Sequence, residues 1–271
     1  MASPVAAEVR RRLPLGMELG LVTYNWGRDW PLPRLLSICE QTGFRGVELR
    51  STHRHGVEPE LSKPQRREVA RRFADSPVVL VGLGTACEYH SPDPARLKQN
   101  IEQTKAFVRL CHDVGGSGIK VRPNGLPPGV PREKTIAQIG KALNQVAAFG
   151  QDYGVQIRLE VHGRGTSELP VVAQIMQVAD HPNATVCWNS NPTDLKGKGL
   201  EHNFRLVAPR LGNTVHIHDL VSEYPWLELF RLLKEINYRG WLLVEEGRPT
   251  ADPLRVMKYY RALWQYMLAL A

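Results

Sequence analysis

Four polar side chains stand at the ends of four apolar, strand-like segments in the second half of the sequence. They are Glu160 in QIRLEVHG, Asn189 in TVCWNSN, His216 in TVHIHDL and Glu245 in WLLVEEG. Two carboxylates, a carboxamide and an imidazole together form a ligand set typical of a divalent cation. Because the set holds oxygen and nitrogen donors and no thiolate, it favours Mn²⁺ or Mg²⁺, with Co²⁺ or Zn²⁺ as alternatives.

The alternation of side chains along a strand assigns a direction to these candidates, since neighbouring residues point to opposite sides. In QIRLEV, Glu160 stands opposite Ile157 and Leu159. His216 and Glu245 likewise stand opposite the apolar residues of their own segments. If the apolar sides pack against helices, the polar sides point into one shared interior, where the four candidates converge.

Each candidate also has a structural interpretation. Glu160 is a potential salt-bridge partner of Arg158 or Arg164, and His216 a potential hydrogen-bonded core histidine. Asn189 is a weaker ligand than aspartate, and its alternative is a cap or turn residue in the NSNPTD stretch. Their common direction at strand ends favours ligation.

A second group of polar residues is predicted to contact a substrate, because each lies at or just beyond the end of a strand-like segment. The group comprises Glu48, His53, Glu88, His90, Lys120, Arg122, His162 and His218. Histidine titrates near neutral pH and suits proton transfer, and basic side chains inside a barrel suit a substrate oxygen or phosphate. The alternative for Lys120 and Arg122 is neutralisation of Glu48 and Glu160.

Eight short β-branched segments alternate with eight longer segments whose apolar residues recur every three or four positions. The strand-like segments lie at 18–24, 45–50, 78–84, 118–123, 155–161, 185–189, 213–219 and 240–246. The helical segments lie at 32–43, 63–75, 94–115, 133–154, 168–181, 200–212, 226–238 and 253–268. Glycines that end helical segments are predicted to be C-caps, namely Gly43, Gly116, Gly154 and Gly212.

Eight strand–helix pairs without a break in composition predict an α/β fold with a single (β/α)₈ TIM barrel at 17–271. A doubly wound sheet is disfavoured, because no GxGxxG follows the first strand. Residues 1–16 are predicted to form a flexible arm or a trimmed leader, since their basic residues are not followed by the apolar stretch of a signal peptide.

Bulk composition narrows the class of protein. With 42% hydrophobic and 23% charged residues, and no apolar run of about 18 residues, the chain is predicted to be globular without a membrane span. Its net charge of +8 is dispersed, so nucleic-acid binding is not favoured. Four cysteines without CxxC spacing predict buried, reduced thiols and a cytoplasmic location. Homo-oligomer formation is left open.

From residue 17 to residue 268 the chain resembles the xylose isomerase-like TIM barrels, which include sugar phosphate isomerases/epimerases and ketose 3-epimerases. The resemblance rests on TGFRGVELR, on LEVHG beside the family's L-E-N-H, on VHIHD beside H-x-K-D, and on YRGWLLVEE beside G-x-x-x-x-E. It implies that Glu160, Asn189, His216 and Glu245 occupy the four metal-ligand positions. In the epimerase branch the two glutamates take and return the substrate proton, which implies that role for Glu160 and Glu245.

The chain departs from the family pattern at three positions. Asn189 stands where aspartate is usual, Pro192 where the epimerase branch has a substrate-binding histidine, and Ser222 where it has an arginine. These departures argue against common ketoses as substrates.

The predicted function is that of a divalent-metal-dependent sugar isomerase or epimerase, which abstracts a proton next to a carbonyl of a carbohydrate. A metal-dependent lyase or deglycosidase acting on 3-keto sugars is one alternative. An endonuclease IV-like nuclease is a second, disfavoured because N-S-N-P at 189–192 replaces that group's D-T-C-H. A non-catalytic sugar-binding barrel is the third, if Asn189 marks a decayed site.

Overall fold

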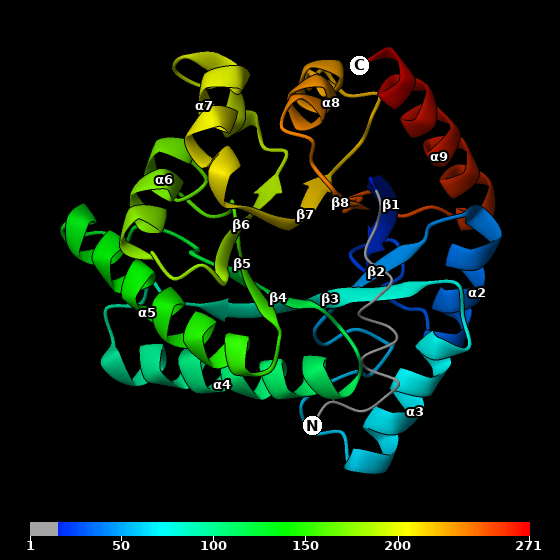
Figure 1. Ribbon diagram of the computed structural model, residues 1–271, viewed down its shortest axis with the longest axis horizontal. Helices are drawn as coiled ribbons and strands as arrows, with labels where there is room; N and C mark the ends of the chain where they lie inside the picture. The colour runs from blue at the N-terminus through cyan, green and yellow to red at the C-terminus, as the bar shows by residue number, and fades with distance from the viewer. Residues whose placement is uncertain (1–15) are drawn as a thin grey trace.

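Eight parallel strands close into one barrel in the computed structural model, which describes residues 16–271 (Figure 1). The strands are β1 (Met17–Val22), β2 (Gly46–Arg50), β3 (Val79–Glu88), β4 (Gly118–Arg122), β5 (Gln156–Glu160), β6 (Ala184–Asn189), β7 (Leu211–Ile217) and β8 (Gly240–Val244). They pair in chain order, and β8 pairs with β1. The predicted TIM barrel is confirmed. The arm predicted at 1–16 lies, apart from Gly16, outside the described residues.

Helices surround the barrel in the described part of the chain. They are α2 (Leu32–Thr42), α3 (Lys63–Ala74), α4 (Pro94–Asp113), α5 (Arg132–Asp152), α6 (Leu169–Val178), α7 (Gly199–Val207), α8 (Trp226–Glu235) and α9 (Pro253–Leu270), with short 3₁₀ helices η1 (Pro192–Leu195) and η2 (Ala208–Arg210). The helix predicted at 200–212 ends early, at Val207, because Pro209 cannot donate the next helical hydrogen bond. The last helix, α9, packs against α2 and completes the ring (Figure 1).

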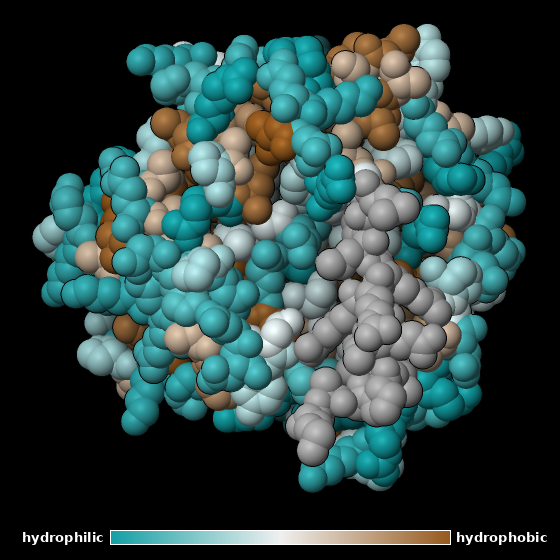
Figure 2. Space-filling model, in the orientation of Figure 1, coloured by the Kyte–Doolittle hydropathy of each residue, from teal (hydrophilic) through white to brown (hydrophobic). Residues whose placement is uncertain are grey.

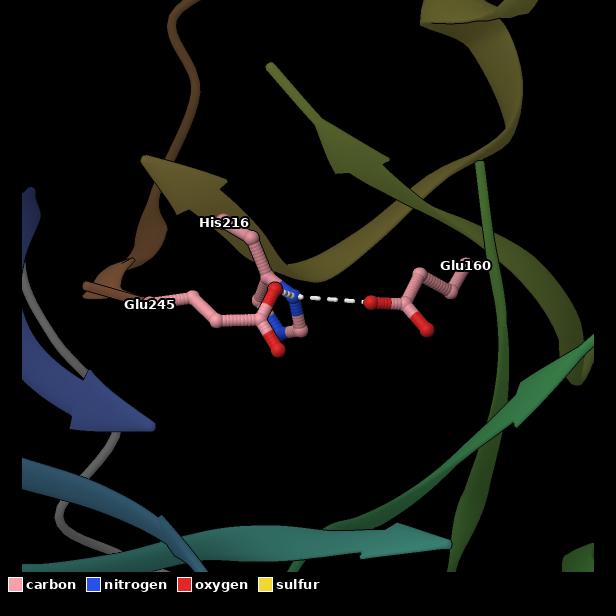
Figure 3. Close-up of side chains that lie close together, drawn as sticks. All are labelled: Glu160, His216 and Glu245. Carbon is pink, nitrogen blue, oxygen red and sulfur yellow. Dashed lines mark ion pairs between the residues drawn. The ribbon is translucent and has the colours of Figure 1, made fainter. Parts of the chain in front are cut away.

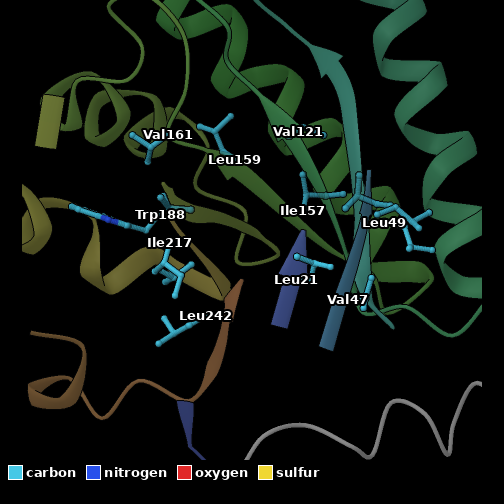
Figure 4. Close-up of a cluster of buried hydrophobic side chains, with 14 of the residues drawn as sticks. Leu21, Val47, Leu49, Val121, Ile157, Leu159, Val161, Trp188, Ile217 and Leu242 are labelled. Atoms are coloured by element: carbon cyan, nitrogen blue, oxygen red, sulfur yellow. The ribbon is translucent and has the colours of Figure 1, made fainter. Parts of the chain in front are cut away.

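The main hydrophobic core lies between the barrel and its helices. Val47 and Leu49 of β2 and Ile157 and Leu159 of β5 are fully or almost fully buried there, as the alternation of their strands predicted (Figure 4). Removing this apolar surface from water contributes roughly 25 cal/mol per Å² to stability. Because the apolar residues are used on the outside, the polar residues between them turn inward.

A second, smaller apolar cluster comprises Val22, Val81, Trp241 and Leu243 from three strands. Val22 lies level with Glu48 in the barrel register, and Leu243 level with His216. Next to this cluster the guanidinium of the buried Arg158 donates to the Val81 carbonyl at 3.2 Å. These groups fill the interior around and below the polar residues, so the barrel is a packed core rather than a pore.

Strand β3 is longer than its sequence predicted. The apolar run ends at Gly84, whereas the strand continues to Glu88 after a register shift against β4. The glycine-rich GLG stretch carries the composition of a turn, but pairing with both neighbouring strands keeps its backbone extended.

The predicted glycine caps have mixed outcomes. Gly43 has a φ of 75° and caps α2, as predicted. The prediction for Gly212 is wrong, because this residue lies inside β7. A Cβ atom at Gly212 would lie 2.4 Å from Thr185 Oγ1 on the neighbouring strand, so close packing between strands explains the glycine.

The face of the molecule in Figure 2 is mostly hydrophilic, with apolar side chains gathered over the region of α7 and α8. All four cysteines are buried, as predicted. Within residues 16–271 no helix is long and apolar enough to cross a membrane. The cytoplasmic location and the homo-oligomer stay predictions.

Candidate active site

Three of the predicted metal ligands meet at the carboxyl-terminal end of the barrel. Glu160 ends β5, His216 is the last but one residue of β7, and Glu245 directly follows β8. One ligand atom from each lies within 4.8 Å of the others. His216 Nδ1 is 3.3 Å from Glu160 Oε1 and 3.4 Å from Glu245 Oε2, so both carboxylates approach the same ring nitrogen (Figure 3).

Burial leaves polar atoms of this cluster without the partners they require. Neither ring nitrogen of His216 has a partner in hydrogen-bonding geometry within residues 16–271, although carboxylate oxygens lie 3.3–3.5 Å away. Both carboxylate oxygens of the buried Glu48 also lack a hydrogen-bond partner among the described residues, and its Oε1 lies 3.5 Å from His216 Nε2. An unsatisfied buried polar group costs about 1–3 kcal/mol. The residues therefore fit a bound cation, which would satisfy Glu160, His216 and Glu245 together.

Asn189, the predicted fourth ligand, ends β6 and contacts the same carboxylate. Its Nδ2 lies 3.4 Å from Glu160 Oε1. Its Oδ1 lies 2.7 Å from His218 Nε2, and His218 Nδ1 lies 2.8 Å from the Glu245 backbone carbonyl. His218 thus connects Asn189 to the segment that carries Glu245.

Lys120 sets the charge of Glu160. Its Nζ donates to Glu160 Oε2 at 2.9 Å, and both side chains are buried. Burial alone would raise the pKa of Glu160, but Lys120 and His216 outweigh burial and hold that pKa well below its usual range. Burial likewise lowers the pKa of Lys120, yet Glu160, Glu245 and Glu48 raise it above its ordinary value. The pair is therefore ionised on both sides at neutral pH.

His216 carries the compensating proton of the cluster. Burial favours the neutral imidazole, but Cys187, Glu48 and Glu160 outweigh burial and raise the pKa of His216 well above its ordinary value. A metal ligand must be neutral imidazole, so a cation bound here would displace this proton.

A cavity of about 250 Å³ opens above the cluster. Its lining is almost entirely polar and comes from the ends of several strands and the loops that follow them. The lining residues are Tyr24, Arg50, Lys120, Arg122, Glu160, His162, Asn189, Asn191, His218, Glu245 and Gly247. Four of the predicted substrate-binding residues thus face this cavity, namely Lys120, Arg122, His162 and His218. Glu48 lies beside it, against His216.

The other predicted substrate-binding residues lie elsewhere. His53 lines a separate cavity of about 490 Å³ with Arg28 and Arg54. His90 lines another, of about 360 Å³, with Arg96 and Arg164.

Glu88 borders the site only through an intermediate. One of its carboxylate oxygens accepts from Arg96 at 3.0 Å and the other from Asn124. Asn124 Oδ1 lies 2.9 Å from His162 Nδ1, on the wall of the central cavity. A substrate role for His53, Glu88 or His90 stays a prediction.

Sequence reasoning missed Tyr24, Arg50 and Asn191 as cavity residues. Arg50 has the same inward direction as Glu48 two residues earlier, so strand alternation contains the signal for it. Asn191 lies in a loop, which has no period to read, whereas Tyr24 ends the strand-like segment predicted at 18–24 and shares the direction of Val22. Asn191 Nδ2 donates to the Asn189 carbonyl at 2.8 Å and so supports the end of β6.

The fold agrees with what the chain is similar to. Residues 36–263 match the family described as Xylose isomerase-like TIM barrel, so the chain belongs to that family, as the sequence motifs predicted. The L-ribulose 3-epimerase of Methylomonas sp. (strain DH-1) is 23% identical over 270 residues, which cover 93% of each protein.

Two crystal structures share the fold. D-Psicose 3-epimerase with D-tagatose, from Clostridium cellulolyticum H10, has a TM-score of 0.77 and 16% identity, covering 93% of this chain and 99% of that chain. The IOLI protein with a zinc atom also has a TM-score of 0.77, with 14% identity over 93% of this chain and 98% of that chain.

Proposed function

We propose that this protein is a divalent-metal-dependent sugar isomerase or epimerase that moves a proton next to a carbonyl group. One observation carries the proposal: two ionised carboxylates, Glu160 and Glu245, flank His216 at the bottom of one polar cavity. Similarity to an L-ribulose 3-epimerase supports a carbohydrate as the substrate.

Glu160, His216 and Glu245 would hold the metal ion, with Asn189 as the fourth ligand. When bound, a divalent ion supplies a Lewis acid for the negative charge that develops on the substrate carbonyl oxygen. The oxygen-rich donor set favours Mn²⁺ or Mg²⁺, and the zinc atom of the IOLI protein supports Zn²⁺ as an alternative.

Asn189 is suited to ligation after rotation of its carboxamide by 180°. His218 Nδ1 faces the Glu245 carbonyl, which can only accept, so this nitrogen carries a proton. When the ring carries only this proton, Nε2 accepts a hydrogen bond, and the Asn189 group that satisfies it is the Nδ2 amide. The rotated carboxamide turns Oδ1 toward Glu160 Oε1, the atom that Nδ2 now faces at 3.4 Å.

The two glutamates are the proton-transfer groups. Lys120 keeps Glu160 in the ionised form that a base requires. Glu245 approaches the same His216 nitrogen from β8, whereas Glu160 approaches it from β5. On this proposal one carboxylate removes a proton from one face of a bound sugar, and the other returns a proton to the opposite face. His162, His218 and Arg122 line the cavity, and on this proposal they bind substrate oxygens.

Hydrogen–deuterium exchange tests this proposal. The protein with Mn²⁺ or Mg²⁺ is incubated in D₂O with ketoses, aldoses and 3-keto glycosides, and deuterium is expected on a carbon next to the carbonyl. Glu160→Gln and Glu245→Gln should each slow the exchange by about 10²- to 10⁴-fold, the usual contribution of a general acid or base. Glu246→Gln is the matched control, because Glu246 is adjacent in sequence and does not line the cavity.

Exchange that neither substitution slows would remove both glutamates from the mechanism. Loss of the aglycone from 3-keto glycosides would instead assign the elimination reaction of a lyase. Sugar binding without exchange anywhere in the panel would assign a non-catalytic barrel.

A further inference from the structure

Two arginines face the substrate cavity from neighbouring parts of the barrel. Arg50 ends β2 and Arg122 ends β4, and both line the cavity that contains Glu160 and Glu245. Strand β3 lies between them, and Gly84 is the β3 residue level with Arg50. A Cβ atom on Gly84 would lie 2.7 Å from Glu48 Oε1, so the missing side chain makes room for the Glu48 carboxylate beside this part of the barrel.

Neither arginine is paired with a carboxylate in the described part of the chain. Among residues 16–271, no carboxylate lies within salt-bridge distance of Arg50 or Arg122. Arg50 instead stacks over the ring of Tyr24, with its Cζ atom 4.6 Å from the ring centroid. The Nε of Arg122 is buried and has no hydrogen-bond partner in that part of the chain.

The other interior cations behave differently. Lys120 pairs with Glu160 at 2.9 Å. Arg158 is fully buried and donates to Gln156 Oε1, the Val81 carbonyl and Ser117 Oγ at 2.9–3.2 Å. These two cations complete the protein's own network, whereas Arg50 and Arg122 present unused donors to the cavity.

Charge balance favours an anion in the space between them. Three cationic side chains and two carboxylates line the cavity, and a divalent cation would add further positive charge. A neutral sugar would leave both arginines without a counter-charge in a partly desolvated site, which is costly. A carboxylate or phosphate would match the planar, forked donors of arginine.

We propose that the substrate is an acidic sugar, and that Arg50 and Arg122 bind its carboxylate or phosphate group. The inference rests on the proposed sugar isomerase or epimerase function and specifies its substrate class. The reacting carbon lies between Glu160 and Glu245, and the anionic end of the sugar points toward the ends of β2 and β4.

The test compares sugars that differ only at carbon 6: D-fructose, D-fructuronate and D-fructose 6-phosphate. Binding is measured by calorimetric titration of the metal-loaded protein, and deuterium exchange is followed in parallel. The anionic sugars are expected to bind about 10- to 100-fold more tightly than fructose, as charge-assisted hydrogen bonds allow. Whichever of the two anionic sugars binds more tightly identifies the preferred anion as carboxylate or phosphate.

Arg50→Gln and Arg122→Gln should each remove most of this preference by raising the dissociation constant of the anionic sugar alone. Arg122→Lys should restore part of it. Arg54→Gln is the control, since Arg54 is exposed and lines the separate cavity of His53. Melting curves of all variants show that they are folded.

Binding and exchange answer different questions. An anion preference that the arginine variants abolish supports the inference, whether or not any sugar exchanges deuterium. Absence of deuterium exchange would count against the proposed function only. Equal binding of all three sugars overturns the inference, and so does an anion preference that both arginine variants retain. If the inference fails in this way but fructose exchanges deuterium, the proposed function is still supported.

Discussion

The two sides of the barrel mouth carry opposite charges, and they differ in how those charges are balanced. The ligand side, Glu160, Asn189, His216 and Glu245, is a dense cluster whose members contact one another. The cationic side, Arg50, Lys120 and Arg122, joins that cluster only through Lys120. A site that binds a cation needs converging acceptors, whereas a site that binds an anion needs donors left open. On the function proposed above, the ligand side would hold the metal and the cationic side would select the substrate.

Lys120 is the connection between the two sides, and its removal should have the largest effect on stability. In Lys120→Met the buried carboxylate of Glu160 loses its counter-charge, and the free energy of unfolding of the metal-free protein should fall by about 3–5 kcal/mol. Urea unfolding measures this change. Lys105→Met is the control, because its pair with Glu102 lies at the surface and should contribute at most about 1 kcal/mol.

A second change separates charge from packing in that experiment. The double variant Lys120→Met, Glu160→Gln removes both charges and should recover part of the lost stability. A double variant less stable than Lys120→Met would show that the lysine matters for packing rather than as a counter-charge.

Asp194, in η1 after β6, is a buried carboxyl group on the ligand side without a cationic partner among the described residues. Burial raises its pKa from 3.8 to about 7, against the opposing hydrogen bonds from Tyr224 and Asn191. The folded state therefore disfavours the ionised form. Its contribution to stability is fully present below about pH 4, falls as the pH rises to about 7, and then stays low.

The size of this pH dependence should be at most about 4 kcal/mol, from 1.36 kcal/mol per pKa unit. Asp194→Asn should flatten the unfolding free energy between about pH 4 and pH 7, as measured by urea unfolding across that range. Asp152→Asn, at an exposed position, should leave the curve unchanged. An unaltered curve in Asp194→Asn would show that Asp194 ionises in the folded protein as it does in water.

Asn189 tests how much charge the ligand side carries. Asn189→Asp should tighten metal binding, because a carboxylate replaces a neutral amide beside the cation. Asn189→Ala should weaken it by about 10- to 100-fold. Calorimetric titration with Mn²⁺ measures both, and equal affinities in all three proteins would remove Asn189 from the ligand set.

Regular alternation explains how much of the site the sequence predicted. The period of two along β5 and β7 assigned Glu160 and His216 to the interior, and the structure brings them together. The same rule predicts that Arg50 points inward. Only the structure adds that no carboxylate of the described residues forms a salt bridge with it. No local pattern in the sequence predicts that Lys120 pairs with Glu160 on the neighbouring strand rather than with Glu48.

Loops and close contacts set the limit of such prediction. Asn191 reaches the cavity from a loop without a period, and Tyr24 reaches it from just beyond the end of β1, although a strand was predicted to residue 24. His53 is the third residue after β2, but its loop turns through Thr52, with φ of 67°, and the side chain lines another cavity. Gly212 serves strand packing rather than a helix end. These outcomes depend on tertiary contacts that one sequence does not encode locally.

Metal titration tests the central claim most directly. The wild-type protein, stripped of metal with a chelator and titrated with Mn²⁺, should bind one ion per chain and release a proton at neutral pH, because His216 must become neutral. His216→Gln should abolish that binding, while Arg122→Gln, on the cationic side, should retain it. Absence of binding to the wild type, or unchanged binding by His216→Gln, would contradict the assignment of the ligand side as a metal site.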